Sequence, residues 1–172
     1  MQQIAEKSTE FNNTAYFCFV DLTKAFDRVK LADVIQCLRE REVPEQIIKV
    51  IRELNTDTTA RIRSNNQTSR PIIIIKNGVR QRDSLSPMRF NLIMDKIIAN
   101  LPKELGYRMG NGPIHIICYA DDAVLIADSE ENLQTLLLRF DQMAERLNME
   151  ISLNKTKFLT ISRNYTKCEA PR

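Results

Sequence analysis

Three carboxylates lie where predicted strands end. Asp21 follows the aromatic and β-branched run at 16–20, and Asp121 and Asp122 separate two apolar segments. Such groups repel one another when crowded together unless a cation compensates their charge. Oxygen ligands without cysteine or histidine suit Mg²⁺ or Mn²⁺, and two such ions about 4 Å apart can catalyse phosphoryl transfer. The pattern therefore predicts a two-metal site, and the alternative is that Asp121 and Asp122 form only a solvated hairpin turn.

The elements predicted around these carboxylates make an α+β domain. Alternating or β-branched residues indicate strands, apolar residues at helical spacing indicate amphipathic helices, and short turns indicate antiparallel hairpins. We therefore expect an antiparallel sheet backed by helices on one face. The predicted strands are 16–20, 114–119 and 123–127, with a hairpin within 59–76 and shorter extended segments at 150–153 and 157–162; the predicted helices lie within 2–11, 31–38, 44–54, 86–101 and 128–147.

Two of these helices carry clear sequence signals. Asp128 and Glu131 have the spacing of a capping box, which predicts that a helix begins there. The helix within 44–54 has apolar residues at the spacing of one helical face. The residues predicted for that face are Ile47, Val50, Ile51 and Leu54.

Length and composition are those of one soluble globular domain. The chain has 172 residues, of which 43% are hydrophobic and 27% charged, so we expect a single domain over residues 1–172. Its apolar runs all fall far short of the ~20 residues of a membrane span, and no signal pattern begins the chain. The 4 cysteines lie far apart without a CxxC pair, which argues against a zinc site. We expect an intracellular protein, cytoplasmic, nuclear or both, that is not secreted and has no membrane partner.

The net charge of +3 is unevenly distributed along the chain. Residues 61–90 hold seven basic side chains and one acidic one, whereas residues 117–150 hold eight acidic and two basic ones. The first stretch can contact phosphates and the second can hold cations, and either can equally be a solvated face.

Four segments carry a specific resemblance. Residues 19–27, Phe-Val-Asp-Leu-Thr-Lys-Ala-Phe-Asp, resemble motif A of reverse transcriptases, and residues 78–87, which contain Gly-Val-Arg-Gln and end in Leu-Ser-Pro, resemble motif B. Residues 119–122, Tyr-Ala-Asp-Asp, match the YxDD box of motif C, and residues 147–157 resemble motif D. The sequences of motifs A and B are similar to those in the reverse transcriptases of non-LTR (LINE-like) retrotransposons. The resemblance implies the palm of an RNA-directed DNA polymerase, with its palm-like antiparallel sheet and motifs A to D.

The resemblance implies which groups hold metal ions. Asp21 and Asp121 would be ligands of two Mg²⁺ or Mn²⁺ ions, with Asp122 a weaker or supporting ligand. Val20 and Leu22 would offer backbone carbonyls beside them. The implied partners are an RNA template with a DNA primer, and deoxynucleoside triphosphates (dNTPs).

Further residues fall where the resemblance implies contact with the incoming nucleotide. Phe26 falls where the family places an aromatic side chain that excludes a ribose 2′-hydroxyl, although it can also be a core residue. Gln81 would contact the nucleotide. Lys155 or Lys157 would lie near the leaving pyrophosphate as an electrostatic stabiliser or proton donor, and one of the two can simply be a solvated strand end.

The sequence departs from the family pattern at two positions. Arg82 follows Gln81 where the family has glycine, so a long charged side chain replaces a residue that permits close backbone approach. We predict lower activity than for an Arg82→Gly variant, and primer-extension rates that stay equal or fall after this change would contradict that. The alternative is that Arg82 reaches a phosphate of the nucleotide. Asn148 stands where glycine is common, a milder departure because asparagine tolerates left-handed geometry.

The chain resembles the palm with little else. We expect the fingers to be largely absent and motif E and the thumb to be absent, which predicts weak or undetectable synthesis by this chain alone. Two other functions stay open: a non-catalytic, decayed palm-like relic with at most weak nucleic-acid binding, and an unrelated two-metal nuclease. Arg82 and the missing flanks favour the relic, and the three intact aspartates oppose it.

Overall fold

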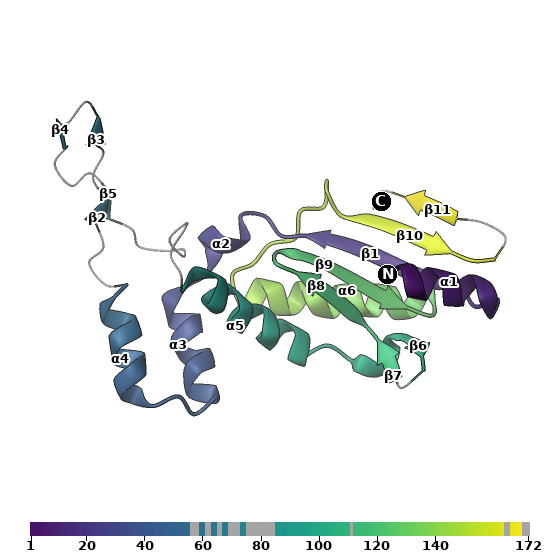
Figure 1. Ribbon diagram of the computed structural model, residues 1–172, viewed down its shortest axis with the longest axis horizontal. Helices are drawn as coiled ribbons and strands as arrows, with labels where there is room; N and C mark the ends of the chain where they lie inside the picture. Colours follow the sequence, from purple (N-terminus) through teal and green to yellow (C-terminus); the bar gives the residue numbers. More distant parts are fainter. Residues whose placement is uncertain are drawn as a thin grey trace. The chain divides into compact units, whose positions relative to one another are not determined.

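The computed structural model (Figure 1) shows a sheet with two helices in one unit and further helices in a second. The two units are residues 1–25 with 95–172, and residues 26–94. The residues that the structure describes are 1–55, 85–110 and 112–163, together with the backbone of five short strands elsewhere.

An antiparallel sheet forms the centre of the first unit. β1 is its central strand and pairs with β9 on one side and β10 on the other. Aromatic and β-branched residues favour these strands because they fit a pleated, half-buried surface. The predicted α+β class with an antiparallel sheet is confirmed. The sheet has the order β11-β10-β1-β9-β8, with β1 (Ala15–Asp21), β8 (Ile116–Tyr119), β9 (Asp122–Ala127), β10 (Lys157–Ile161) and β11 (Thr166–Glu169).

One face of the sheet is covered by α6 (Glu130–Arg146), which lies behind it in Figure 1. The prediction that α6 is capped by Asp128 is wrong by one residue. The side chain of Ser129 accepts a hydrogen bond from the backbone N–H of Asn132 at 3.2 Å and so satisfies a free donor of the first turn. Asp128 instead accepts from the side chain of Asn132 at 2.8 Å.

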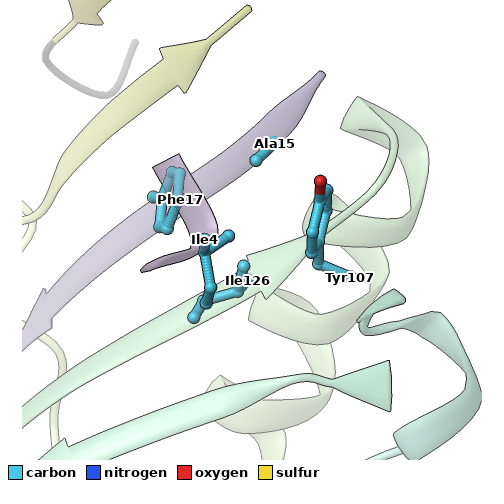
Figure 2. Packing of buried hydrophobic residues seen from close by; sticks show 5 residues of the cluster. All are labelled: Ile4, Ala15, Phe17, Tyr107 and Ile126. Carbon is cyan, nitrogen blue, oxygen red and sulfur yellow. The ribbon is translucent and has the colours of Figure 1, made fainter. Parts of the chain in front are cut away.

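The opposite face is covered at one end by α1 (Gln2–Glu10), which lies in front of the sheet in Figure 1. Figure 2 shows Ile4 of α1 among side chains of the sheet. We call this cluster the covered end; it consists of Ile4, Ala15, Phe17, Tyr107 and Ile126, each at most 3% exposed. Side chains alternate between the faces along a strand, so Asp21 and Asp122 lie on this same face, at what we call the open end.

The predicted strand at 114–119 is interrupted at His115. β7 (Gly112–Ile114) pairs with β6 (Tyr107–Met109), whereas the positions paired with β9 begin at Ile116, next to a hydrogen bond of 3.0 Å from the N–H of Ile126 to the carbonyl of His115. The backbone of Gly106 comes so close that a Cβ there would lie 2.7 Å from backbone atoms of Ile114 and His115. This close approach needs glycine, and it lets the chain change partners at His115. The short 3₁₀ helix η1 (Lys103–Leu105) precedes this region.

The second unit consists mainly of helices. α3 (Leu31–Glu40) and α4 (Glu45–Glu53) pack against each other, and α2 (Ala25–Arg28) and α5 (Ser86–Ala99) contribute most of their residues to this unit. Antiparallel pairing of β2 with β5 confirms the predicted hairpin within 59–76. Its short strands are β2 (Thr59–Ala60), β3 (Arg63–Ser64), β4 (Gln67–Thr68) and β5 (Ile73–Ile74).

The buried side of α4 differs from the predicted one. Ile47, Val50 and Leu54 are each more than half exposed, whereas Ile48 and Ile51 are buried. α4 is apolar over a wide arc, and only one edge of that arc meets neighbouring side chains, so the sequence pattern overstated its buried face. Among the described residues, no helix is both long and apolar enough to cross a membrane.

Candidate active site

Asp21 and Asp122 face each other at the open end of β1 and β9. The strand register pairs these two residues directly. The carbonyl of Asp21 accepts a hydrogen bond at 2.8 Å from the N–H of Ser152, on the other side of β1. Asp21 and Asp122 therefore form a non-hydrogen-bonded pair, the type that brings the two Cα atoms closest, to about 4.5 Å. The side chain of Asp21 is 30% exposed, and Asp122 is exposed.

Asp121 lies in the two-residue loop between β8 and β9. Tyr119 pairs with Asp122 across this loop, and Ala120, the first loop residue, has a φ of 53°. Positive φ at this position is typical of the type II′ hairpin turn, where glycine is usual. In alanine it costs about 1–2 kcal/mol. The loop thus holds the exposed Asp121 in a strained turn directly beside Asp122.

The chain reaches the site from α6 through a defined helix ending. Asn148 has a φ of 61°. Its N–H donates to the carbonyl of Glu145 at 2.9 Å, and the N–H of Met149 donates to the carbonyl of Ala144 at 2.8 Å. These two bonds and the left-handed residue make a Schellman motif. The left-handed geometry expected to be tolerable at Asn148 is therefore present.

Beyond this ending the chain pairs with the end of β1. Leu22 and Ile151 form an antiparallel bridge, next to the hydrogen bond from Ser152 to Asp21. Thr156 is only 1% exposed, and its Oγ1 donates to the carbonyl of Ser152 at 2.9 Å, which closes a turn. The bridge and the turn together hold this segment against the strand that carries Asp21.

The same turn places Lys155 at the carboxylate of Asp21. Lys155 Nζ lies 3.2 Å from Asp21 Oδ2. Lys157, the other candidate, lies on β10 opposite Phe19, two positions before Asp21 along β1. The structure therefore distinguishes two lysines that the sequence left equivalent, because only Lys155 is shown in contact with this carboxylate.

The two backbone carbonyl candidates are placed differently. Val20 pairs with Ala123 inside the ladder between β1 and β9, so its carbonyl belongs to the sheet. The hydrogen bonds beside the bridge of Leu22 and Ile151 come from neighbouring residues, so the carbonyl of Leu22 takes part in neither. Leu22 is the better placed of the two to offer an oxygen next to Asp21.

The donor groups at the open end fit a hard divalent cation. Carboxylates of Asp21, Asp121 and Asp122 supply the oxygen ligands that Mg²⁺ and Mn²⁺ prefer. Within the part of the chain that the structure describes, no three acidic, histidine or cysteine side chains already converge into a metal cluster. Binding one ion through all three aspartates therefore requires these exposed side chains to turn toward it.

Thiols near the site do not compete as ligands. Burial raises the pKa of the Cys18 thiol on β1 to about 12. Burial, with a smaller effect of the Asp95 charge, raises the pKa of Cys118 on β8 to about 11. Cys18 also lies three positions before Asp21 on β1, and Cys118 lies one position before the partner of Asp122 on β8. Because side chains alternate between the faces along a strand, both thiols are on the opposite face of the sheet from the facing carboxylates. Because metal binding requires a thiol to lose its proton, a raised pKa further disfavours them as ligands.

Of the nucleotide-contact candidates Phe26, Gln81 and Arg82, the structure describes Phe26, which lies in the second unit. Phe26 is half-buried and stacks on Phe90, with ring centroids 4.7 Å apart and planes at 27°. One face of the Phe26 ring is thus occupied and its orientation fixed, which suits a core role and a nucleotide-facing role alike. Gln81 and Arg82 lie outside the described residues.

One member of the basic stretch at 61–90 does not face solvent. Arg89 is 2% exposed, and its Nη1 donates to Asn55 Oδ1 at 2.6 Å. The guanidinium of Arg89 is therefore buried inside the second unit and hydrogen-bonded there. We accordingly do not expect Arg89 to contact phosphates.

Residues 1–169 match the family model of the reverse transcriptases, described as RNA-dependent DNA polymerases. The chain belongs to the reverse transcriptase family. This confirms the resemblance carried by the four motifs and the enzyme class that it implied. Reverse transcriptases use divalent metal ions, a nucleic acid template and dNTPs.

Retrotransposon proteins are similar to this reverse transcriptase chain. It is 31% identical to the Retrovirus-related Pol polyprotein from type-1 retrotransposable element R2 of Nasonia vitripennis. The aligned region of 149 residues covers 85% of this chain and 14% of that protein. It is 30% identical over 149 residues to the protein of the type-2 element R2DM of Drosophila melanogaster, covering 86% and 14%. The expected similarity to non-LTR retrotransposons is confirmed, and the chain spans about 14% of these relatives' length. Among solved structures, apo telomerase from Candida tropicalis, truncated from its C-terminal domain, matches 98% of the chain and 40% of its own, with 13% identity and a TM-score of 0.49.

Two residues that build the site were not predicted. Ser152 acts through its backbone N–H, which no side-chain pattern marks. Thr156 acts through a buried hydroxyl. Its place in the polar run Asn-Lys-Thr-Lys directly before a strand is a turn signal that could have found it.

Proposed function

We propose that this chain is the palm of a non-LTR retrotransposon reverse transcriptase, which adds dNTPs to the 3′ end of a DNA primer on an RNA template. The observation that carries the proposal is the pair of facing carboxylates, Asp21 and Asp122, at the open end of the sheet, with Asp121 in the adjoining loop. Family membership supports the reaction class. The proposal is also supported by the paired strands and the loop, which bring carboxylates to one end of the sheet.

The metal ligands in this proposal are Asp21, Asp121 and Asp122, with the carbonyl of Leu22 and, secondarily, that of Val20. Two Mg²⁺ or Mn²⁺ ions, when bound, activate the attacking 3′-hydroxyl and neutralise the leaving pyrophosphate. The chain's own contribution is position. The register of β1 and β9 fixes two carboxylates at one level, and the strained hairpin loop fixes the third beside them.

Other residues act on the nucleotide. Lys155, and Lys157 as the second candidate, stabilise the leaving pyrophosphate or donate a proton to it. Phe26 excludes a ribose 2′-hydroxyl, and its stack on Phe90 holds the ring in one orientation for that purpose. Gln81 contacts the incoming nucleotide, and Arg82 beside it lowers the rate.

The test is incorporation of a labelled dNTP on a primed RNA template, with Mg²⁺ or Mn²⁺, by the chain and by its Asp121→Asn variant. We expect weak incorporation that the variant loses. Equal incorporation by both would contradict the proposal, and cleavage of the template or primer would indicate a two-metal nuclease. Absence of any product with either protein would favour the non-catalytic relic, which the Arg82 substitution also favours.

A further inference from the structure

Lys155 and Asp21 form an ion pair between distant parts of the sequence. The ammonium nitrogen lies 3.2 Å from Asp21 Oδ2, with the lysine side chain 70% exposed and the aspartate side chain 30% exposed. Pairs such as Lys7 with Glu10, by contrast, join neighbours on one helix turn. The contact of Lys155 with Asp21 therefore depends on how the segment after α6 is folded against β1.

Backbone hydrogen bonds fix the position of the Lys155 main chain relative to Asp21. Ser152 donates its N–H to the carbonyl of Asp21 itself, at 2.8 Å. The N–H of Lys155 donates to the carbonyl of Ser152 at 3.1 Å, and the Thr156 hydroxyl donates to the same carbonyl at 2.9 Å. The main chain of Lys155 is thus tied, through one residue, to the main chain of Asp21.

In this geometry the lysine ammonium contacts the carboxylate oxygen that a divalent ion would also bind. A Mg²⁺ ion bound to Asp21 Oδ2 at about 2.1 Å would lie within about 5 Å of an ammonium that kept its present contact with the same oxygen. Two cations that close repel each other strongly at a partly buried carboxylate. The ion and the ammonium therefore compete for Asp21 Oδ2.

We infer that Lys155 is a displaceable counter-cation of Asp21, so that a divalent ion must compete with it and, on binding, releases it. The inference rests on the proposed function, because it assumes that Asp21 binds the metal ion. Released from Asp21, the ammonium is available to the triphosphate of an incoming nucleotide. Metal binding and the supply of a free lysine at the pyrophosphate are thereby coupled through one carboxylate.

The expected size of the effect is modest because the lysine is largely exposed. Exposed ion pairs stabilise proteins weakly, so removing the ammonium should tighten metal binding by about two- to fivefold. Lys155→Met removes the charge and keeps the length of the side chain. Lys155→Arg keeps the charge, and Lys157→Met removes an equal charge two residues away, on β10.

The experiment measures the Kd of Mn²⁺ by electron paramagnetic resonance of the free ion, for the chain and these variants. We expect a two- to fivefold lower Kd for Lys155→Met and nearly unchanged values for Lys155→Arg and Lys157→Met. An unchanged or higher Kd for Lys155→Met would overturn the inference. So would an equal gain from Lys157→Met, which would show a general effect of net charge.

A second measurement needs no substitution at the lysine. In the unmodified chain, ¹⁵N resonances of lysine ammonium groups are followed while Mg²⁺ is added. The Lys155 signal should change over the same Mg²⁺ range as the signals of the β1 end, and an unchanged Lys155 signal would contradict its displacement.

The Asp21→Asn variant separates the two failures. If this variant binds Mn²⁺ as tightly as the unmodified chain, Asp21 is no ligand and the proposed function is wrong. If it binds more weakly while Lys155→Met leaves the Kd unchanged, the proposed function stands and only the role of Lys155 is wrong.

Discussion

The two ends of one sheet face differ in what covers them. At the covered end, α1 places Ile4 over Phe17 and Ile126, and all three are at most 2% exposed. At the open end, four residues along the same two strands, Asp21 faces Asp122, the Asp21 side chain is 30% exposed and Asp122 is exposed, and within the first unit α1 packs at the other end. Because the strands and the face are the same, the helix, rather than the sheet, decides which end stabilises the fold and which end can bind a ligand.

This difference separates stability from chemistry along a short length of sheet. Burial of large apolar side chains at the covered end stabilises the fold. Facing carboxylates at the open end repel each other unless a cation lies between or beside them. Substitutions at the covered end should therefore lower mainly the free energy of unfolding, whereas substitutions at the open end should lower mainly the activity.

The largest expected effect is on activity at the open end. Asp21→Asn and Asp121→Asn should each lower the weak metal-dependent dNTP incorporation expected of the chain to below detection, a loss of at least about tenfold, because each removes a charged ligand. The free energy of unfolding, measured in urea, should change by less than about 1 kcal/mol, because relieved repulsion offsets the loss, in Asp21→Asn, of the largely exposed ion pair with Lys155. A large loss of stability in either variant would show that the open end also holds the fold together.

The next effect is on stability at the covered end. Ile4→Ala should lower the free energy of unfolding by about 2–5 kcal/mol, because it leaves a cavity over Phe17 and Ile126. Ile47→Ala is a matched control, since Ile47 is also the third residue of its helix but is 51% exposed. The control should cost less than about 1 kcal/mol. Equal losses from the two variants would mean that α1 contributes no more than an exposed helix position.

A smaller effect is expected in the loop that carries Asp121. Ala120→Val should destabilise the chain by about 1–2 kcal/mol, because a β-branched side chain is strained at a φ of 53°. Ala120→Gly should change stability in the opposite direction or not at all, since glycine adopts this φ without strain. Thermal unfolding of both variants tests this, and a valine variant as stable as the glycine variant would argue against a strained turn.

The smallest effect is a pH dependence next to the covered end. Burial lowers the pKa of His115 from its usual 6.5, and Nε2 of this residue is buried with no hydrogen-bond partner among the residues that the structure describes. The unfolded chain therefore takes up a proton more readily, so stability is lost as the pH falls below about 6.5. His115→Gln should reduce the loss between pH 7.5 and 5.5 by less than about 1 kcal/mol, as measured in urea, and identical pH profiles would contradict this.

Much of the fold followed from local patterns in the sequence. Alternating and β-branched residues marked β1 and β9, and the acidic pair between two apolar segments marked a hairpin tip. These signals act within a few residues, so one sequence reveals them. The three aspartates could be selected as ligands because their residue type and their position at strand ends are both visible in the sequence.

Features set by tertiary contacts could not be predicted in the same way. The register that places Asp122 opposite Asp21 depends on pairing across about 100 residues. Lys155 and Lys157 differ only in how the chain turns after Ser152, through backbone hydrogen bonds. The break at His115 depends on the approach of Gly106. Each of these involves partners that sequence spacing does not specify.

The helix ending at Asn148 has a consequence for variation in this family. The Schellman motif fixes where the chain leaves α6, and the hydrogen bond from Ser152 to Asp21 fixes where it meets β1. Six residues, 149–154, separate Asn148 at the helix ending from Lys155. Substitutions among these six residues should be tolerated more readily than a change in the length of the segment. Insertion or deletion of one residue there would move Lys155 away from Asp21 even if every other residue were unchanged.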